Sequence, residues 1–143
     1  GKLSVENLTI KELSSDTIQK RSDLLKDANV TVRLLTPTII EDETLRIETM
    51  LEAARRAYSQ VFRRGKPSLN EPKIEGERFR FMTYGGWSLK ENRKRRLHSA
   101  LEPGSIYRFT EVDEELKLAL SSLERCYAIG SFKTHGCGQI LLS

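Results

Sequence analysis

Apolar side chains recur along this chain with two different periods, and the two periods predict strands and helices in turn. Residues 29–35, which read NVTVRLL, alternate and are rich in β-branched residues, so they predict a strand. The longest regular segment, residues 43–64, places Met50, Ala54 and other apolar side chains at helical spacing. Gly65 follows this segment and is expected to end the helix.

The second half of the chain shows the same two periods. Residues 76–84, which read GERFRFMTY, predict a half-buried strand with Phe79 and Phe81 on one face and the neighbouring arginines on the other. Further along, the pattern predicts three more strands and one helix, at residues 97–101, 105–110 and 139–142 and at residues 113–125, respectively.

The order of the main elements predicts the fold class. From residue 29 it reads strand, helix, strand, strand, helix, strand, which is the βαββαβ order of an α+β, ferredoxin-like domain. We expect residues 29–143 to form one such domain, with helices on one sheet face and the other face open. Residues 1–28 are expected to be an N-terminal extension that carries a short helix at 15–26. RNA-recognition domains share this architecture, but residues 105–110 lack their aromatic signature.

Composition excludes several classes of protein. The chain has 143 residues, 38% of them hydrophobic and 31% charged, which indicates a globular protein with a real core. The sequence shows no apolar run of membrane-helix length and no signal peptide, so we expect a cytoplasmic protein with no membrane partner. Cys126 and Cys137 have no second pair of ligands beside them, and we expect neither a metal site nor a cofactor.

The distribution of charge points to an anionic partner. Residues 53–96 hold thirteen basic and four acidic side chains, a net charge of +9, between flanks of net −3 and −2. Most of these cations are arginines, which grip phosphates with a fork of N–H donors, whereas a surface that only needs solubility is served by lysine. We therefore expect a nucleic-acid contact. Its candidates in this block are Arg55, Arg56, Arg63, Arg64, Lys90, Arg93, Lys94, Arg95 and Arg96.

A second candidate site lies near the end of the chain, in the segment GSFKTHGCGQILL. Glycine permits positive φ and close approach of the backbone to a ligand, and such loops present N–H groups to phosphate oxygens. Two titratable side chains lie in the same loop. A flexible connection between packed elements explains the glycines equally well. The candidates for RNA contact in this loop are Gly130, Lys133, His135, Gly136 and Gly138.

Four segments together resemble the RAMP superfamily of CRISPR-associated proteins. They are VTVRLLTPTII, GGWSLKENRKRR, LEPGSIYRF and GSFKTHGCGQILL. The order of the second and third is similar to that in the C-terminal, ferredoxin-like domain of Cas-five-like subunits of type III interference complexes. Those relatives usually carry two such domains, whereas this chain has room for one, and Cys137 stands where their loop commonly has an aromatic residue.

The resemblance implies a guide-RNA-binding subunit, with CRISPR guide RNA and other subunits of an effector complex as partners. Some RAMP relatives cleave guide-RNA precursors without metal, which requires a base and an acid. Here His98 and His135 are the candidate catalytic residues, but no spacing places them together. We expect a binding subunit with no catalytic residue. A metal-independent endoribonuclease that processes CRISPR RNA and a purely structural subunit remain the alternatives.

Overall fold

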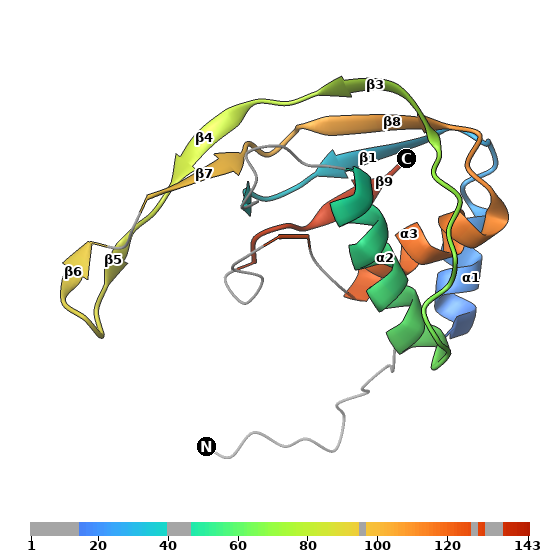
Figure 1. Ribbon diagram of the computed structural model, residues 1–143, viewed down its shortest axis with the longest axis horizontal. Helices are drawn as coiled ribbons and strands as arrows, with labels where there is room; N and C mark the ends of the chain where they lie inside the picture. The colour runs from blue at the N-terminus through green and yellow to red at the C-terminus, as the bar shows by residue number, and fades with distance from the viewer. Residues whose placement is uncertain (1–14, 40–46, 95–96, 127–128, 131–135) are drawn as a thin grey trace, which may run out of the picture.

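A four-stranded antiparallel sheet with helices on one face forms the body of the molecule (Figure 1). The computed structural model describes residues 15–39, 47–94, 97–126, 129–130 and 136–143. The elements of the body are α1 (Ser15–Asp23), β1 (Val30–Leu34), α2 (Ile47–Phe62), β3 (Lys73–Arg78), β8 (Ile106–Thr110), α3 (Glu114–Cys126) and β9 (Ile140–Leu142). The strands lie in the order β3-β8-β1-β9, and each pairs antiparallel with its neighbours.

This arrangement confirms the predicted fold class. After β1 come α2, β3, β8, α3 and β9, which is the βαββαβ order, and the last strand pairs with the first, as a ferredoxin-like sheet requires. The strands predicted at 29–35 and 105–110 lie side by side in one sheet, with Val32 opposite Tyr107. The predicted helices and the final strand are also present, with ends within a few residues of their expected positions.

The core lies between the sheet and the helices. In β1, Val30, Val32 and Leu34 are buried, whereas Arg33 between them is exposed, so the strand turns alternate side chains toward the helices and away from them. The buried side chains form one cluster with apolar residues of α2 and α3, including Met50. Removal of this apolar surface from water is the main force that holds the layers together.

Helix α1 packs against α3 and joins the same body. Its Ile18 is fully buried. Arg21 reaches Glu124 of α3 with two hydrogen bonds, from Nε at 2.6 Å and from a terminal nitrogen at 2.9 Å, and also donates to the carbonyl of Leu142 at 2.6 Å. Glu124 in turn accepts a hydrogen bond from the Leu142 N–H. One ion pair therefore connects α1, α3 and β9. The predicted domain boundary between residues 28 and 29 stays a prediction.

A curved arm of paired strands extends beyond the body (Figure 1). Its elements are β2 (Thr38–Ile39), β4 (Phe81–Tyr84), β5 (Trp87–Ser88), β6 (Arg93–Lys94) and β7 (His98–Leu101). Strand β7 pairs with β2 and β4, and β5 pairs with β6 at the tip. The predicted short strand at 97–101 is β7. The sequence pattern did not reveal β2 or the β5–β6 hairpin, because strands of two residues are too short to show a period.

The single strand predicted at 76–84 was wrong, because the chain divides there into β3 of the body and β4 of the arm. Between these two strands, the chain forms hydrogen bonds with a turn at residues 102–105. Arg80 N–H donates to Ser105 Oγ, and Glu102 N–H donates to the Arg80 carbonyl. The expected shared face of two phenylalanines is therefore also wrong. Phe79 packs edge-on against Tyr107 in the core, whereas Phe81 is 57% exposed.

Candidate functional site

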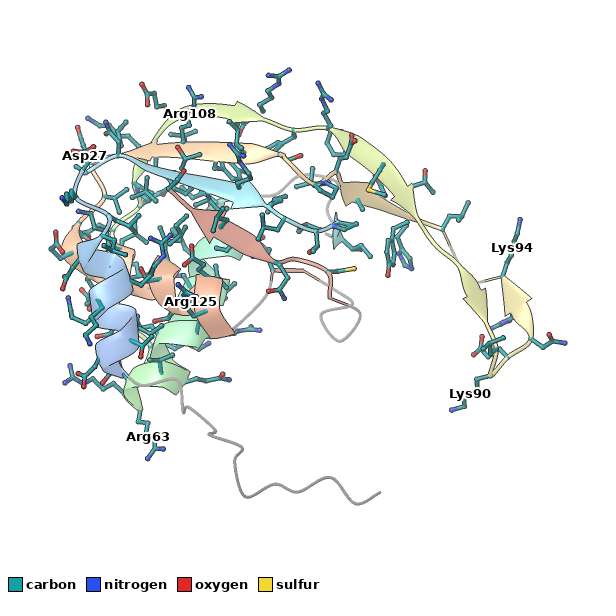
Figure 2. All side chains as sticks on the ribbon, turned by 180° about the vertical axis from the view of Figure 1, so that it is seen from behind. Asp27, Arg63, Lys90, Lys94, Arg108 and Arg125 are labelled. Carbon is teal, nitrogen blue, oxygen red and sulfur yellow. The ribbon has the colours of Figure 1, made fainter. Side chains whose placement is uncertain are left out.

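The candidate cations of the basic block that the structure describes lie in two separate places. Figure 2 shows Lys90 and Lys94 at the tip of the arm and Arg63 at the far end of α2, on the other side of the molecule. The block is continuous along the chain, but the fold sends α2 into the helical layer and the β5–β6 hairpin away from the body. The described candidates therefore form an arm-tip group and an α2 group, and the α2 group is Arg55, Arg56, Arg63 and Arg64.

The arm-tip group consists of Lys90, Arg93 and Lys94. All three side chains are exposed. Arg93 donates to Glu91 at 2.8 Å, and the turn that separates the two strands includes Asn92 at a positive φ of 49°. Neither lysine has an ion-pair partner among the described residues, so both charges face solvent. Arg95 and Arg96 lie outside the described residues.

The α2 group is partly neutralised by a single carboxylate. Glu52 accepts hydrogen bonds from Lys66 at 2.7 Å and from Arg56 at 3.2 Å, and Arg55 lies 3.6 Å away. The hydrogen bond from Lys66 and then that from Arg56 hold the pKa of the Glu52 carboxyl below its usual value. These ion pairs are therefore present at neutral pH and are lost only as the pH falls through that lowered pKa.

The remaining two arginines of this group lie where α2 ends. Arg63 takes a positive φ of 51°, and the Arg64 carbonyl accepts a hydrogen bond from Ser59 Oγ at 2.6 Å. Both side chains are exposed. They extend the α2 group away from the arm, since Arg63 projects from the end of the helix in Figure 2.

Replacing Glu52 with glutamine tests whether the α2 group contacts an anionic partner. The neutral side chain releases Arg55, Arg56 and Lys66, so RNA affinity should rise and the log–log salt slope should steepen by about 0.7 for each cation that then reaches a phosphate. Glu48→Gln is the matched control, because Glu48 is an exposed carboxylate one turn earlier in the same helix. If both variants bind RNA as the wild type does, the α2 group lies outside the interface. Affinity is measured by fluorescence anisotropy over a salt series.

Two glycines of the predicted loop serve the protein's own backbone. Gly130 and Gly138 have positive φ values of 80° and 81°, and a Cβ on either would overlap a main-chain carbonyl oxygen, that of Ile39 or that of Ile129. Gly138 N–H donates to the Pro37 carbonyl at 3.0 Å. The close approach that glycine permits here is therefore an approach to neighbouring chain segments.

Gly136 differs from the other two glycines. It is exposed, its φ is 81°, and a Cβ at this position would meet nothing within 4 Å. Among the described glycines of the loop it is thus the one with open space toward a ligand. Lys133 and His135, which the sequence analysis placed in the same loop, lie outside the described residues.

On one face of the arm, the glycine-rich segment lies near His98, the candidate histidine that the structure describes. Ala100 of β7 packs with Ile39 of β2 and with the buried Cys137, and Tyr84 packs against this cluster. His98 is half-buried, lies two residues before Ala100 and opposes Tyr84 in the strand ladder, so it belongs to the same face. The arm, β2 and the segment after Gly136 therefore pack together on one side of β7, which we call the arm face.

Sequence reasoning missed a third group of cations. Arg33 of β1 opposes Ile106 of β8, and Ile106 also opposes Arg78 of β3, so the two arginines flank Ile106 on the sheet face away from the helices. They are distant in the sequence, and only the strand register brings them together. Arg108 projects from this face as well (Figure 2).

The described residues also bear on metal binding and on membrane insertion. Within them, no group of three or more His, Cys, Asp or Glu side chains is placed to hold a metal ion. No helix in the same part of the chain is long and apolar enough to cross a membrane.

Comparison with known proteins gives a family for nearly the whole chain. The sequence profile of a family described as CRISPR-associated protein (Cas_Cmr3) matches residues 3–143. No curated protein matches significantly.

Solved structures of a Cas6 protein have the same fold. Its product complex superposes with a TM-score of 0.58 at 14% identity, over 91% of this chain and 58% of the other. Its substrate mimic complex gives a TM-score of 0.54 at 14% identity, over 88% and 57% of the two chains. The chain thus spans less than two thirds of the Cas6 structures, and this likeness shows the fold alone. Together the two findings confirm the predicted RAMP-type, ferredoxin-like architecture.

Proposed function

The chain belongs to the Cas_Cmr3 family of CRISPR-associated proteins, and from this premise we propose that it is a non-catalytic, guide-RNA-binding subunit of a type III CRISPR effector complex. The observation that carries the proposal is the arm, which holds Lys90 and Lys94 beyond the body with no ion-pair partner among the described residues. Exposed cations without an ion-pair partner attract the phosphates of a nucleic acid.

The arm also has the features of a surface that other molecules cover. Leu89 at its tip is 90% exposed, Leu97 is 66% exposed, and Phe81 at its base is largely exposed as well. The β5–β6 hairpin has only two residues in each strand and pairs with no third strand among the described residues. Such a hairpin is marginally stable alone in water. Contacts with RNA or with a neighbouring subunit would stabilise it.

We further infer that RNA passes along the arm face. The half-buried His98 belongs to this face, the exposed Gly136 directly precedes Cys137 of the same cluster, and the cations of the arm tip lie further out along the arm. Guanidinium and ammonium groups would contact phosphates, which supports binding without strong dependence on base sequence. A phosphate oxygen accepts hydrogen bonds, so His98 would contribute through an N–H of its ring.

The double variant Lys90→Ala/Lys94→Ala tests the proposal. RNA affinity should fall about a hundredfold, because each of the two lost charge-assisted contacts is worth about 1.5 kcal/mol and about 1.4 kcal/mol corresponds to a tenfold change. The log–log salt slope should also fall by about 1.4, two contacts at the single-strand coefficient. Anisotropy titrations with a labelled repeat RNA at several salt concentrations measure both quantities.

The matched control for this variant is Lys20→Ala/Lys26→Ala, which removes the same charge from exposed positions on and just after α1. It should leave the salt slope within error. If the two double variants behave alike, the arm tip is not an RNA contact and the purely structural alternative gains support.

The same titrations, run with chelator present, test for cleavage. The RNA recovered from each of them should be intact on a denaturing gel. Cleavage that disappears in His98→Ala or His135→Ala would replace this proposal with the endoribonuclease alternative.

A further inference from the structure

We propose that a pocket formed by Arg33, Arg78 and Arg80 is a phosphate-binding site. The pocket has a volume of about 340 Å³ and lies where the four-stranded sheet gives way to the arm. Its other lining residues belong to the turn into β8, Pro103 to Ile106. None of the arm-tip cations takes part in it. The inference therefore goes beyond the proposed function, since a phosphate can occupy this pocket whether or not the arm binds RNA.

The strand register places two of the arginines on opposite sides of one residue. Ile106 pairs with Arg33 on one side and with Arg78 on the other, so the backbones of the two arginines are about 10 Å apart, two strand spacings. Paired residues of antiparallel strands point to the same face of the sheet. Both side chains are long enough to converge on an anion held above Ile106.

The third arginine is held in place by its own backbone. Arg80 N–H donates to Ser105 Oγ at 3.2 Å, and the Arg80 carbonyl accepts from Glu102 N–H at 2.7 Å. Ser105 is buried, and its hydroxyl donates to the Glu102 carbonyl at 2.8 Å. Gly104 N–H donates to the Leu34 carbonyl at 2.7 Å, which fixes the turn against β1. Hydrogen bonds therefore fix the wall of the pocket, and the exposed arginine side chains extend from it.

None of the acidic residues that the structure describes forms an ion pair with the arginines of this pocket. Among the described residues, Arg21, Arg55, Arg56, Arg93 and Arg125 each lie within 4 Å of a glutamate oxygen. Arg33, Arg78 and Arg80 have no such partner in the same part of the chain, and no described residue that lines the pocket is acidic. Three guanidinium groups around one cavity repel one another, and a bound anion would relieve that repulsion.

Phosphate is the anion that this arrangement fits best. A guanidinium offers five N–H donors in a planar fork that matches the oxygens of a phosphate in pairs. Three forks can surround a tetrahedral group from three directions, whereas the planar carboxylate of a peptide is satisfied by one or two. The phosphate can belong to the RNA backbone or can be a terminal phosphate, and the two sources share this chemistry.

The first experiment measures phosphate binding directly on the full chain. Inorganic pyrophosphate is titrated while NMR follows the side-chain Nε–H signals of Arg33, Arg78 and Arg80 and the amide signals of Gly104 to Ile106. We expect saturable shifts in the wild type and binding weaker by about tenfold or more in Arg33→Gln/Arg78→Gln, because two charge-assisted contacts are lost. Lys20→Gln/Lys26→Gln removes the same charge elsewhere and should bind as the wild type does. An absence of shifts in this region, or equal binding by both variants, overturns the proposal.

The second experiment identifies the source of the phosphate. One RNA sequence is prepared with a 5′-monophosphate and with a 5′-hydroxyl. If the pocket takes a terminal phosphate, Arg33→Gln/Arg78→Gln weakens binding of the first RNA alone, and if it takes a backbone phosphate, both lose affinity equally. Either result supports the site.

A poly-glutamate peptide is the remaining probe. If the two arginines are needed for binding of this peptide but not for binding of pyrophosphate, the pocket belongs to an interface with an acidic protein surface, and the proposal is overturned. Circular dichroism confirms that each variant is folded. Arg33→Lys/Arg78→Lys, which keeps the charge but removes the forks, should show an intermediate loss.

Discussion

Replacing Glu124 with alanine is expected to destabilise the protein by about 3 kcal/mol, since breaking one side of a buried ion pair leaves the other charge uncompensated. The side chain of Glu124 is only 5% exposed, and the side chain of its partner Arg21 is 14% exposed. The hydrogen bond from Arg21 to Glu124 raises the pKa of that guanidinium in the wild type. The variant lacks this bond, but an arginine is charged at neutral pH without it, so Arg21 is left as an uncompensated charge. The Leu142 N–H also loses its acceptor.

Thermal unfolding followed by circular dichroism measures this effect. For a chain of this length the loss corresponds to a melting temperature lower by about 10 °C. Glu115→Ala is the control, because it removes an exposed carboxylate from the same helix and should change the stability by about 0.5 kcal/mol at most. If the two variants melt within a degree or two of each other, the ion pair does not hold α1 to the body.

Replacing Gly138 with alanine is expected to destabilise the protein by about 3 kcal/mol, because backbone strain adds to a steric clash. The residue has a φ of 81°, and the added Cβ would overlap the carbonyl oxygen of Ile129. The backbone cannot easily shift to relieve the clash, since Gly138 N–H donates to the Pro37 carbonyl and its own carbonyl accepts from Ile129 N–H, each at 3.0 Å.

Gly136→Ala is the matched control for this substitution. Its φ is the same, 81°, but the new methyl group meets nothing within 4 Å, so only the conformational penalty of about 1 kcal/mol applies. Denaturant unfolding of the two variants therefore separates the steric contribution from the strain they share. Equal losses of stability would show that the segment moves to accommodate a side chain at Gly138. The glycine would then be available to approach a ligand.

The sequence by itself determined the order and type of the main elements. Residues such as Val30, Val32 and Leu34 alternate because one sheet face is buried, and the pattern of α2 is helical because one side of it is buried. These patterns are local consequences of burial, so they are visible in the sequence as a period. The order that follows is the ferredoxin-like one, and the segments that resemble RAMP proteins lie in the chain that the Cas_Cmr3 family profile matches.

Of the candidate site, the sequence could give the residue types but not their grouping. The excess of arginine is visible in the composition, yet the described arginines of the block divide among an α2 group, an arm-tip group and, for Arg78 and Arg80, the pocket beside β8. Glu52 neutralises part of the first group, because a helical turn and the chain reversal after α2 bring Arg56 and Lys66 to one carboxylate. That contact depends on the path of the chain after the helix, which has no signature in composition.

Only the tertiary structure decided which groups the glycines approach and where the strand predicted at 76–84 divides into two. Gly130 and Gly138 have the same φ as Gly136, but their neighbours are carbonyl groups of Ile39 and Ile129, which arrive from other parts of the fold. Likewise Arg33, Arg78 and Arg80 share one pocket because β1 and β3 pair with opposite sides of β8. A period reports which side of an element is buried. It does not report which strand lies alongside, because that is set by long-range pairing and packing.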